Sequence, residues 1–558
     1  MGTCFSRLKQ LSQACLPLSD ENQNSSSHLF DHEYNQASSS KSSFDFIQDD
    51  INDCLIEAEK IFLSVIDIVN LPIELQRLIE IANTDRGWLK ILDSMINIIG
   101  MNTINGAIEN DHIGPTIIIL LLEDTPLPTK ELIGDLLNLF DNYLTLPIHS
   151  PCDVSIIKHR NVCTILAFLA EKMAGTLSTN LLSLKIIKFL EKIIRDNLNH
   201  LHVLFALNCI EKFSLTRENK DFIQKHFDII KELCELEKYL NDFRLETLYT
   251  STTSELLKFQ VGFNAQWCLD NVFIKRGRKL SYKKVDYSNL NAILNVNDKT
   301  EFLKLSPNGL SARCDTFTFE CVRCNYPISE GVYFYEVILL TSGIMQIGWA
   351  TKLTQFKNHE GSGVGDDRHS IAFDGCRNVI WHNMNHHKHT LGSWVAGDVV
   401  GCLIDFNNKK FIFYLNGKKF EITKKIAEKL GLTFSSGPYY AACSLMSYQQ
   451  CYFNFGQEPF KFPPKKILFK DFDSESKSDS NRSQCEEEFK IIPMHVKLRS
   501  CSKSFSFINK RNLCNICYDR SSNIRLKPCN HEAICNKCAS LIDQCPFCRL
   551  NITHFDEI

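Results

Sequence analysis

Seven cysteines and one histidine between residues 514 and 548 have the types and the spacing of metal ligands. They form four short pairs: Cys514 with Cys517, Cys529 with His531, Cys535 with Cys538, and Cys545 with Cys548. Thiolate and imidazole groups at such spacings are the ligands of tetrahedral zinc, and eight ligands suffice for two Zn2+ ions. The alternative is a set of free cysteines in a small core. It is disfavoured because the segment has few apolar side chains with which to build that core.

The order and spacing of these pairs resemble the RING finger over the whole of residues 514–548. The resemblance implies interleaved pairing. One zinc ion would bind Cys514, Cys517, Cys535 and Cys538, and the other would bind Cys529, His531, Cys545 and Cys548. The spacing by itself permits sequential pairing equally well, so the interleaving comes from the resemblance alone.

The resemblance also implies roles for residues that are not ligands. RING-type ubiquitin ligases have no nucleophile of their own and bind a ubiquitin-charged conjugating enzyme. In similar RING fingers, the apolar surface for that enzyme includes the positions of Ile516, Ile542 and Pro546, and an exposed apolar cluster on a small module is a contact site. Arg549 stands where active members carry a cation, which could bridge enzyme and ubiquitin and hold the thioester in a reactive geometry. The alternative is that Arg549 is simply solvated.

The composition is that of a soluble protein with several domains. A length of 558 residues predicts two to four domains, and shares of 44% hydrophobic and 23% charged residues are ordinary. A net charge of −3 gives no nucleic-acid signature. Many further cysteines lie outside the candidate zinc sites without framework spacing, which indicates a reducing compartment. We therefore expect a cytoplasmic protein with no membrane span and no secretory signal.

The amino terminus has the pattern for lipid attachment. It reads MGTCFS, in which Gly2 could accept myristate and Cys4 could accept palmitate. Two such signals together are needed for a stable membrane anchor, and the alternative is an unmodified tail. Residues 1–47 are otherwise rich in Ser, Asn, Gln and Asp, which predicts a flexible tether.

Residues 48–285 show the period of α-helices. Apolar residues recur three and four positions apart, for example at Val162, Ile165, Leu166 and Leu169. The stretch HVLFALNCIEKFSLTRENK is similar to an armadillo or HEAT helix pair. We therefore expect an α-helical repeat domain whose stacked pairs offer a long surface to a partner, or alternatively a compact helical bundle.

The period changes in residues 286–463, where β-rich runs alternate with turns. The run KFIFYL is followed by Asn416-Gly417, a dipeptide typical of two-residue hairpins, and short strands of this kind predict an antiparallel β-sandwich. The strings GVYFYEV, IGWAT, GDDRHSIAFDG, GDVVGCLIDFNNKKFIFYLNG and YFNFG resemble the SPRY domain in this order. That resemblance implies a protein-recognition module without catalytic residues. We expect the loops near Asp366–Arg368 and Trp381–Trp394 to face a protein partner, or else to be only solvated.

Two other groups in this region have metal-binding residue types but not the pattern of a site. Cys321 and Cys324 form a pair with no second pair nearby, which favours ordinary structural cysteines. Four histidines at positions 382, 386, 387 and 389 lie close together, and we interpret them as part of a solvated loop without a fixed surround.

The remaining segments complete the predicted order of domains. Residues 464–510 are acidic and serine-rich at first and basic later, which predicts a flexible linker. The RING-type finger follows at 511–552, with a tail at 553–558.

Helical repeats, SPRY domain and carboxy-terminal RING in this order resemble the RING finger and SPRY domain-containing protein family. The resemblance implies an E3 ubiquitin ligase that binds a protein substrate through its SPRY domain, its helical domain or both. The alternative is a zinc-containing scaffold that recruits proteins without transferring ubiquitin. The tail after Arg549, with Ile552 and Phe555, could also pack across a twofold axis and make the finger a homodimer, as in some similar fingers.

Overall fold

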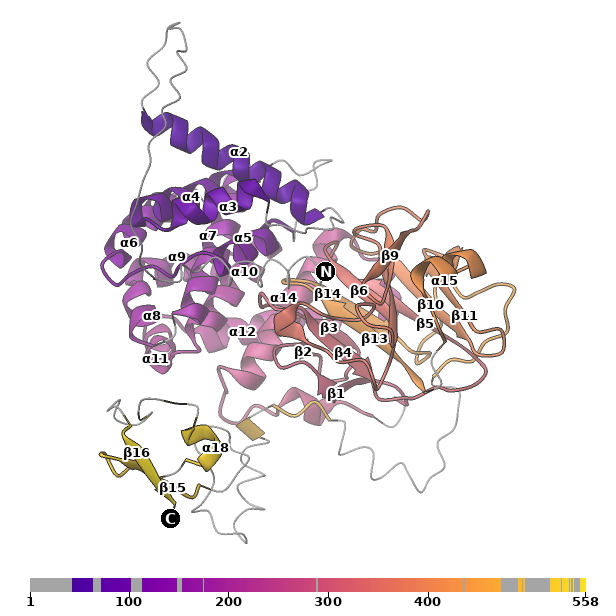
Figure 1. Ribbon diagram of the computed structural model, residues 1–558. Coiled ribbons are helices and arrows are strands. Elements are labelled where there is room, and N and C mark those ends of the chain that lie inside the picture. The colour runs from indigo at the N-terminus through magenta and orange to yellow at the C-terminus, as the bar shows by residue number, and fades with distance from the viewer. Residues whose placement is uncertain are drawn as a thin grey trace, which may run out of the picture. The chain divides into compact units, whose positions relative to one another are not determined.

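The computed structural model contains two compact units, Met1–Ile491 and Ile492–Ile558 (Figure 1). The described residues are 43–63, 72–101, 113–147, 153–173, 175–287, 290–434, 437–472, 490–493, 495–496, 522–532, 534–540, 542, 545 and 552–557. The first unit joins a helical region to a β-sandwich, and the second contains the cysteine-rich segment. The predicted order of a helical region followed by a β-sandwich is confirmed.

The helical region begins the first unit. Its helices are α2 (Ser43–Leu63), α3 (Ile73–Ala82), α4 (Asp85–Ile98), α5 (Ile113–Glu123), α6 (Ile133–Leu144), α7 (Asp153–Lys172), α8 (Thr176–Leu181), α9 (Leu184–Asp196), α10 (His200–Phe213), α11 (Arg217–His226), α12 (Ile229–Glu237), α13 (Leu245–Leu248) and α14 (Thr253–Asn271), with short 3-10 turns η2 (Lys238–Asp242) and η3 (Ser281–Lys284).

Local sequence explains where these helices begin and which face they bury. Ser183 caps α9 by accepting a hydrogen bond from the Ile186 amide, and α14 starts with a capping box formed by Thr252 and Glu255. Helix α9 buries a single apolar stripe, whereas α10 is buried on all sides. An all-round buried helix lies in the interior of its domain, so α10 is a central element of the region.

The helices pack in two layers. One layer runs from α4 and α5 through α7 and α10 to α14, with each helix contacting the next, and the other runs through α6, α9 and α12. Contacts of α6 with α7, α9 with α10, and α12 with α14 join the layers. The helical character that the sequence predicts for this region is confirmed.

The β-sandwich consists of two seven-stranded antiparallel sheets. The first has the order β1-β4-β13-β6-β7-β8-β9 and the second the order β12-β11-β10-β5-β14-β3-β2. The strands are β1 (Leu294–Lys299), β2 (Lys304–Leu305), β3 (Ser311–Arg313), β4 (Glu320–Cys324), β5 (Val332–Leu339), β6 (Met345–Thr351), β7 (Ser370–Asp374), β8 (Val379–His382), β9 (Asn385–Lys388), β10 (Val399–Asp405), β11 (Lys410–Leu415), β12 (Lys418–Glu421), β13 (Tyr439–Leu445) and β14 (Gln450–Asn454), with 3-10 turn η4 (Asn358–Glu360) and helix α15 (Lys424–Leu430).

The predicted hairpin at Asn416-Gly417 is confirmed. Leu415 pairs with Lys418 across the turn, and both central residues have positive φ, 50° and 76°. This is the backbone of the primed turns that match the twist of paired strands. The core between the sheets is aromatic: Tyr335 packs edge-on against Trp349 at 5.0 Å, and Phe472 closes the same cluster.

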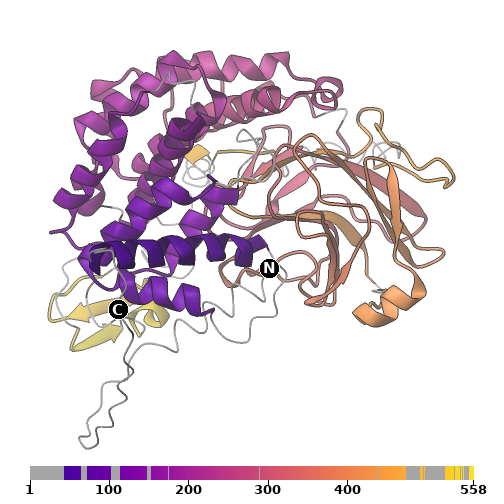
Figure 2. The ribbon, with the colours of Figure 1, turned by 90° about the horizontal axis from the view of Figure 1, so that it is seen from above.

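The sandwich packs directly against the helical region, as Figures 1 and 2 both show. Thr116 of α5 donates a hydrogen bond to the Ser447 carbonyl at 2.9 Å, and Phe205 of α10 contacts Tyr448 at a centroid distance of 5.0 Å. Gln260 of α14 donates to the Leu340 carbonyl at 3.0 Å. The sandwich therefore contacts α5, α10 and α14, all of them in the same helical layer.

Buried charges join the two parts. The ammonium group of Lys304 on β2 lies 2.8 Å from Asp315 and 2.5 Å from Glu211 of α10, and Arg313 pairs with the same Asp315 at 2.7 Å. Burial alone would raise the pKa of Asp315, but Arg313 and Lys304 hold it well below its usual value. The network is complete only when helices and sandwich are together, because Glu211 comes from one and Lys304 from the other.

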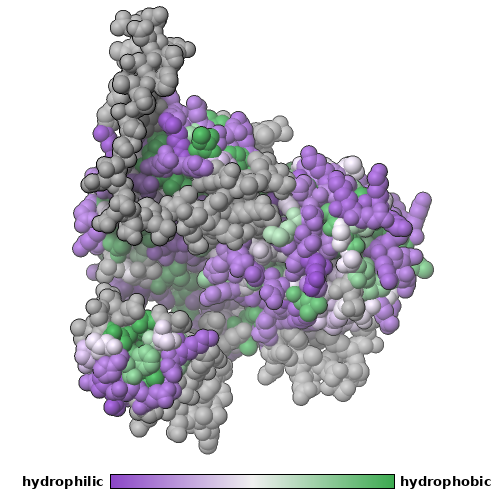
Figure 3. Space-filling model, viewed as in Figure 1, coloured by the Kyte–Doolittle hydropathy of each residue, from purple (hydrophilic) through white to green (hydrophobic). Residues whose placement is uncertain are grey.

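Among the described residues, no helix combines the length and the apolar character that crossing a membrane requires. On the face shown in Figure 3, hydrophilic residues cover most of the coloured surface of the first unit.

Candidate metal centre

The cysteines of the second unit that the structure describes lie on or beside a two-stranded sheet and a short helix. Strands β15 (Ile524–Lys527) and β16 (His554–Glu557) pair antiparallel, and a short helix, α18 (Asn536–Ala539), packs on β15. A small apolar cluster that includes Ile524, Leu526 and Ile534 is fully buried. So small a core makes metal ligands a necessary source of stability for a unit of this size.

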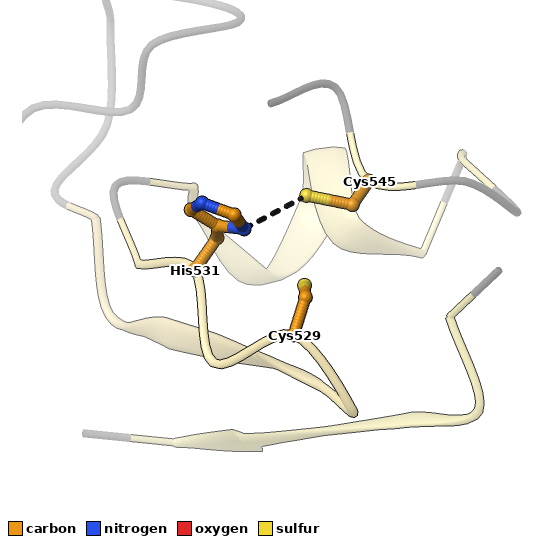
Figure 4. A group of neighbouring side chains, drawn as sticks. All are labelled: Cys529, His531 and Cys545. Carbon is orange, nitrogen blue, oxygen red and sulfur yellow. Dashed lines mark hydrogen bonds between the residues drawn. The ribbon is translucent and has the colours of Figure 1, made fainter. Parts of the chain in front are cut away.

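Three of the predicted ligands converge at one point: Cys529, His531 and Cys545 (Figure 4). Their ligand atoms all lie within 4.8 Å of one another. Cys529 and His531 come from the turn after β15, where the Asn530 amide donates to the Leu526 carbonyl and the Leu526 amide donates to the His531 carbonyl. Asn530 takes a left-handed conformation with φ 59°, which an asparagine tolerates. This tight turn aims both side chains at Cys545.

The spacing of these atoms fits a shared zinc ion. Cys545 Sγ lies 3.5 Å from His531 Nδ1. In a tetrahedral site with Zn–S of about 2.3 Å and Zn–N of about 2.0–2.1 Å, a sulfur and a nitrogen ligand lie about 3.5–3.6 Å apart. Two soft thiolates and an imidazole are also the donor set that zinc prefers. The group can therefore hold a zinc ion with a fourth ligand.

The other predicted ligands are divided between described and undescribed parts of the chain. Cys535 is the residue directly before α18 and Cys538 lies within the helix, and both side chains are buried. Neither belongs to the group of Cys529, His531 and Cys545. Cys514, Cys517 and Cys548 lie outside the described residues.

Of the residues predicted to contact a conjugating enzyme, the structure describes Ile542 alone. Its side chain is half-buried against the small core of the unit. Ile516, Pro546 and Arg549 lie outside the described residues, as do Gly2 and Cys4, the predicted lipidation positions.

In the sandwich, the segments expected to face a partner contain strands and several buried side chains. Residues 381–394 include most of the β8–β9 hairpin, and the flanking residues Trp381 and Trp394 are only 3% and 2% exposed. Asp366 is buried as well, and Arg368 is the exposed member of its group.

The prediction of a solvated histidine loop is wrong. His382 and His389 are buried, with His382 Nδ1 2.8 Å from the Ser370 carbonyl and His389 stacked on Phe373. Burial lowers the pKa of both imidazoles. Polar letters alone do not show that His382 ends the buried strand β8 and lies against the Ser370 carbonyl, or that His389, which follows β9, stacks on Phe373. Among the described residues, Cys529, His531 and Cys545 form the one metal-ligand group, so these histidines are not part of one.

The Cys321–Cys324 pair is structural, as predicted. The two residues lie on β4, three positions apart, where side chains point to opposite faces of the sheet. Cys321 receives a hydrogen bond from Ser444 at 3.1 Å, and Cys324 lies in the core between the sheets. Burial raises the pKa of the Cys324 thiol to about 12, so it is a protonated, inert thiol.

Comparisons with known proteins define the class of both modules. Residues 332–458 match the SPRY domain model, and residues 510–555 match the zinc finger, C3HC4 type (RING finger). The chain therefore combines a SPRY domain with a C3HC4-type RING finger. It is 44% identical over 146 residues to E3 ubiquitin-protein ligase RKP of Arabidopsis thaliana, which corresponds to 26% of this chain and 11% of that protein. These findings support the family predicted from the sequence, that of RING and SPRY E3 ligases.

Other similarities cover single domains. ATP-dependent RNA helicase DDX1 of Xenopus laevis is 28% identical over 138 residues, 25% of this chain and 17% of the helicase. The SPRY domain of human HERC1 aligns with 29% of this chain and 96% of its own length, at 12% identity and a TM-score of 0.24. The TRIM65 PSpry domain aligns with 30% of this chain and 94% of its own length, at 14% identity and a TM-score of 0.23. The matched segments thus span a small part of the full-length relatives RKP and DDX1.

Proposed function

We propose that this protein is a RING-type E3 ubiquitin ligase that recruits a protein substrate through its first unit. The observation that carries the proposal is the convergence of Cys529, His531 and Cys545 at zinc-ligand distances within a segment that matches the C3HC4 RING finger. The similarity to a plant protein named as an E3 ubiquitin ligase supports the same function.

Two zinc ions are proposed, with interleaved ligands. The grouping of Cys529 and His531 with Cys545 supports this pairing, because sequential pairing would instead combine Cys529 and His531 with Cys514 and Cys517. The second ion would then take Cys514, Cys517, Cys535 and Cys538. The zinc ions hold the fold of the module and supply no step of the transfer reaction.

The proposed mechanism is positioning. A conjugating enzyme would dock on an apolar surface formed by Ile516, Ile542 and Pro546, and the half-exposed state of Ile542 is compatible with such a contact. Arg549 would bridge the conjugating enzyme and ubiquitin. A substrate lysine would then attack a thioester held in a reactive geometry, with no covalent intermediate on this chain.

Self-ubiquitination tests the proposal. The purified chain is incubated with ubiquitin, activating enzyme, ATP and a panel of conjugating enzymes, beside Cys514→Ser and Arg549→Ala. Polyubiquitin chains that are absent with Cys514→Ser and less abundant with Arg549→Ala would support the proposal. The matched control is Arg525→Ala, because Arg525 is an exposed arginine of the same unit that pairs with Glu532, and it should keep full activity. If the protein binds two zinc ions but forms no polyubiquitin with any conjugating enzyme, the result would instead indicate the non-catalytic scaffold.

A homodimer through the carboxy-terminal strand is a proposal of the same kind. Ile552 packs against the small core of the unit, whereas Phe555 on β16 remains 36% exposed. An exposed aromatic side chain on a two-stranded sheet favours a further contact. Sedimentation velocity of the wild type and Phe555→Ala decides this, and an unchanged monomer in both excludes the dimer.

Membrane attachment through Gly2 and Cys4, from a cytoplasmic location, completes the proposal. The motif at the amino terminus supports it. Cell fractionation of Gly2→Ala beside the wild type tests it, and an identical distribution of the two proteins would remove it.

A further inference from the structure

The junction between helices and sandwich contains an open cavity of about 260 Å3. Its helical side is formed by η2, α13, α14 and η3, and its sandwich side by the turn before β3 and by Tyr452 of β14. Phe243, Val285 and Tyr452 are each half-exposed, so the cavity opens to the surface. Neither part of the first unit could form it alone.

The interior of the cavity is apolar and aromatic. Its lining includes Leu245, Leu248 and Phe263 together with an aromatic row in which Phe259 contacts Phe243 at 5.4 Å and Tyr452 at 6.3 Å. The volume lies below the roughly 300–1,000 Å3 of small-molecule sites. Apolar and aromatic anchors buried in such pockets supply most of the binding energy of peptide contacts.

The edge of the cavity is positively charged. Arg244 and Lys284 are the lining residues that carry charge at neutral pH, and both side chains are exposed. Two acids close by are already engaged, Asp242 with Lys258 at 3.0 Å and Glu237 with Arg278. A ligand with negative charge beside an apolar anchor is therefore complementary to the site, and one with positive charge is repelled.

We propose that this cavity binds a partner protein through a peptide segment in which a large apolar or aromatic residue is flanked by acidic residues. The apolar residue enters between Phe243, Phe259 and Tyr452, and the carboxylates lie against Arg244 and Lys284. The inference rests on the proposed function only in treating that partner as a substrate. It places recognition at the junction of the helices and the sandwich rather than on the sandwich loops alone.

Direct binding to the full-length protein tests the site. The probes are fluorescein-labelled nine-residue peptides with Phe, Leu or Ala at the centre and Glu, Ser or Lys on both sides, measured by fluorescence anisotropy. The Glu-flanked Phe and Leu peptides should bind most tightly, and their affinity should fall with salt because the flanking contacts are exposed. Equal binding of all peptides, or of none, would overturn the proposal.

Three variants locate the binding. Arg244→Glu should weaken the Glu-flanked peptides by about fivefold or more, since a charge reversal replaces attraction by repulsion at the surface. Val285→Trp should fill the cavity and reduce binding of every peptide with a large centre. Lys279→Glu is the matched charge-reversal control, because Lys279 is exposed and does not line the cavity. Binding that is unchanged in Arg244→Glu and Val285→Trp would exclude this cavity.

Two further measurements separate the alternatives. Replacing Glu486–Glu488 with Gln in the full chain should leave peptide affinity unchanged; an increase would assign the cavity to the chain's own acidic segment and overturn the assignment to a partner. Cys514→Ser should retain peptide binding while losing ubiquitin transfer. A wild-type protein that forms ubiquitin chains but binds none of the peptides would refute the site, whereas a wild-type protein that binds the peptides but forms no ubiquitin chains would refute only the ligase.

Discussion

Replacing Lys304 with Met should destabilise the helices and the sandwich together. The ammonium group of Lys304 is the cation shared by Glu211 and Asp315, and these three side chains are 5%, 10% and 1% exposed. Burial alone would lower the pKa of Lys304, but Asp315 and Glu211 raise it above its ordinary value, so the group is charged in the folded protein. Arg313 would still neutralise Asp315 in the variant, whereas Glu211 would lose its ion-pair partner.

The expected loss is about 3–5 kcal/mol of unfolding free energy, the usual result of leaving one charge of a buried pair uncompensated. Lys352→Met is the matched control. Lys352 also pairs with an aspartate, Asp298, but its side chain is 51% exposed, and an exposed pair contributes at most about 1 kcal/mol. Adding Glu211→Leu to Lys304→Met should restore part of the loss, because the orphaned charge is then removed as well.

Urea denaturation with two probes measures this prediction. Circular dichroism at the helix band reports the helical region, and tryptophan fluorescence reports largely the sandwich, which holds Trp349, Trp381 and Trp394. The two transitions should coincide in the wild type and shift together in Lys304→Met. Separate transitions in the wild type, or a loss below about 1 kcal/mol in Lys304→Met, would refute the conclusion that the network joins both parts into one folding unit.

The remaining predictions concern pH, packing and metal. Burial lowers the pKa of His159 to about 4 and that of His202 to about 3. Between pH 6.5 and these values the unfolded chain therefore binds more protons than the folded chain, and lowering the pH to 5 should reduce the free energy of unfolding by about 2 kcal/mol per histidine. Urea titrations at pH 7 and pH 5 should show a smaller difference in a His159→Gln, His202→Gln double variant. Gly348→Ala should lower stability by about 1–3 kcal/mol, because the new Cβ would collide with the Ile371 carbonyl. Gly134→Ala, in α6 with open space around it, should instead raise stability by up to about 1 kcal/mol. A thermal melt in which Gly348→Ala unfolds at a higher temperature than Gly134→Ala would contradict this. A strong zinc chelator should release two ions per chain, measured with a metal-sensitive dye, and unfold the second unit while the circular dichroism of the first stays unchanged; release of one ion, or of none, would contradict the proposed sites.

Several features could be predicted from the sequence because they depend on neighbouring residues. The Asn416-Gly417 hairpin requires two successive residues with positive φ, a requirement that this dipeptide fulfils locally. The predicted zinc ligands Cys529 and His531 are two positions apart, and the turn after β15 that carries them is also local. Helical and strand periods, which extend over ten residues or fewer, correctly divided the first unit into helices followed by a sandwich.

Other features depend on residues far apart in the chain. The histidines at 382–389 read as a solvated loop because each is polar, yet His382 is buried at the end of β8 and His389, just after β9, is buried against Phe373. The cavity between α14 and Tyr452 has no sequence signature, because its walls come from segments some 190 residues apart, a separation that no local pattern can report.

The sequence by itself determined the modules and their order, because metal-ligand spacing, periodicity and turn dipeptides are properties of short segments. The tertiary structure decided that the helical layer formed by α5, α10 and α14 is covered by the sandwich instead of being open to a partner. The physical reason is the burial of Lys304 with Glu211 and Asp315, together with an apolar cluster that joins Leu256 and Phe259 of α14 to Ile338 and Val399 of the sandwich. Such burial joins residues far apart in the sequence, such as Glu211 and Lys304, so it depends on how the folded surfaces of the helices and the sandwich pack together.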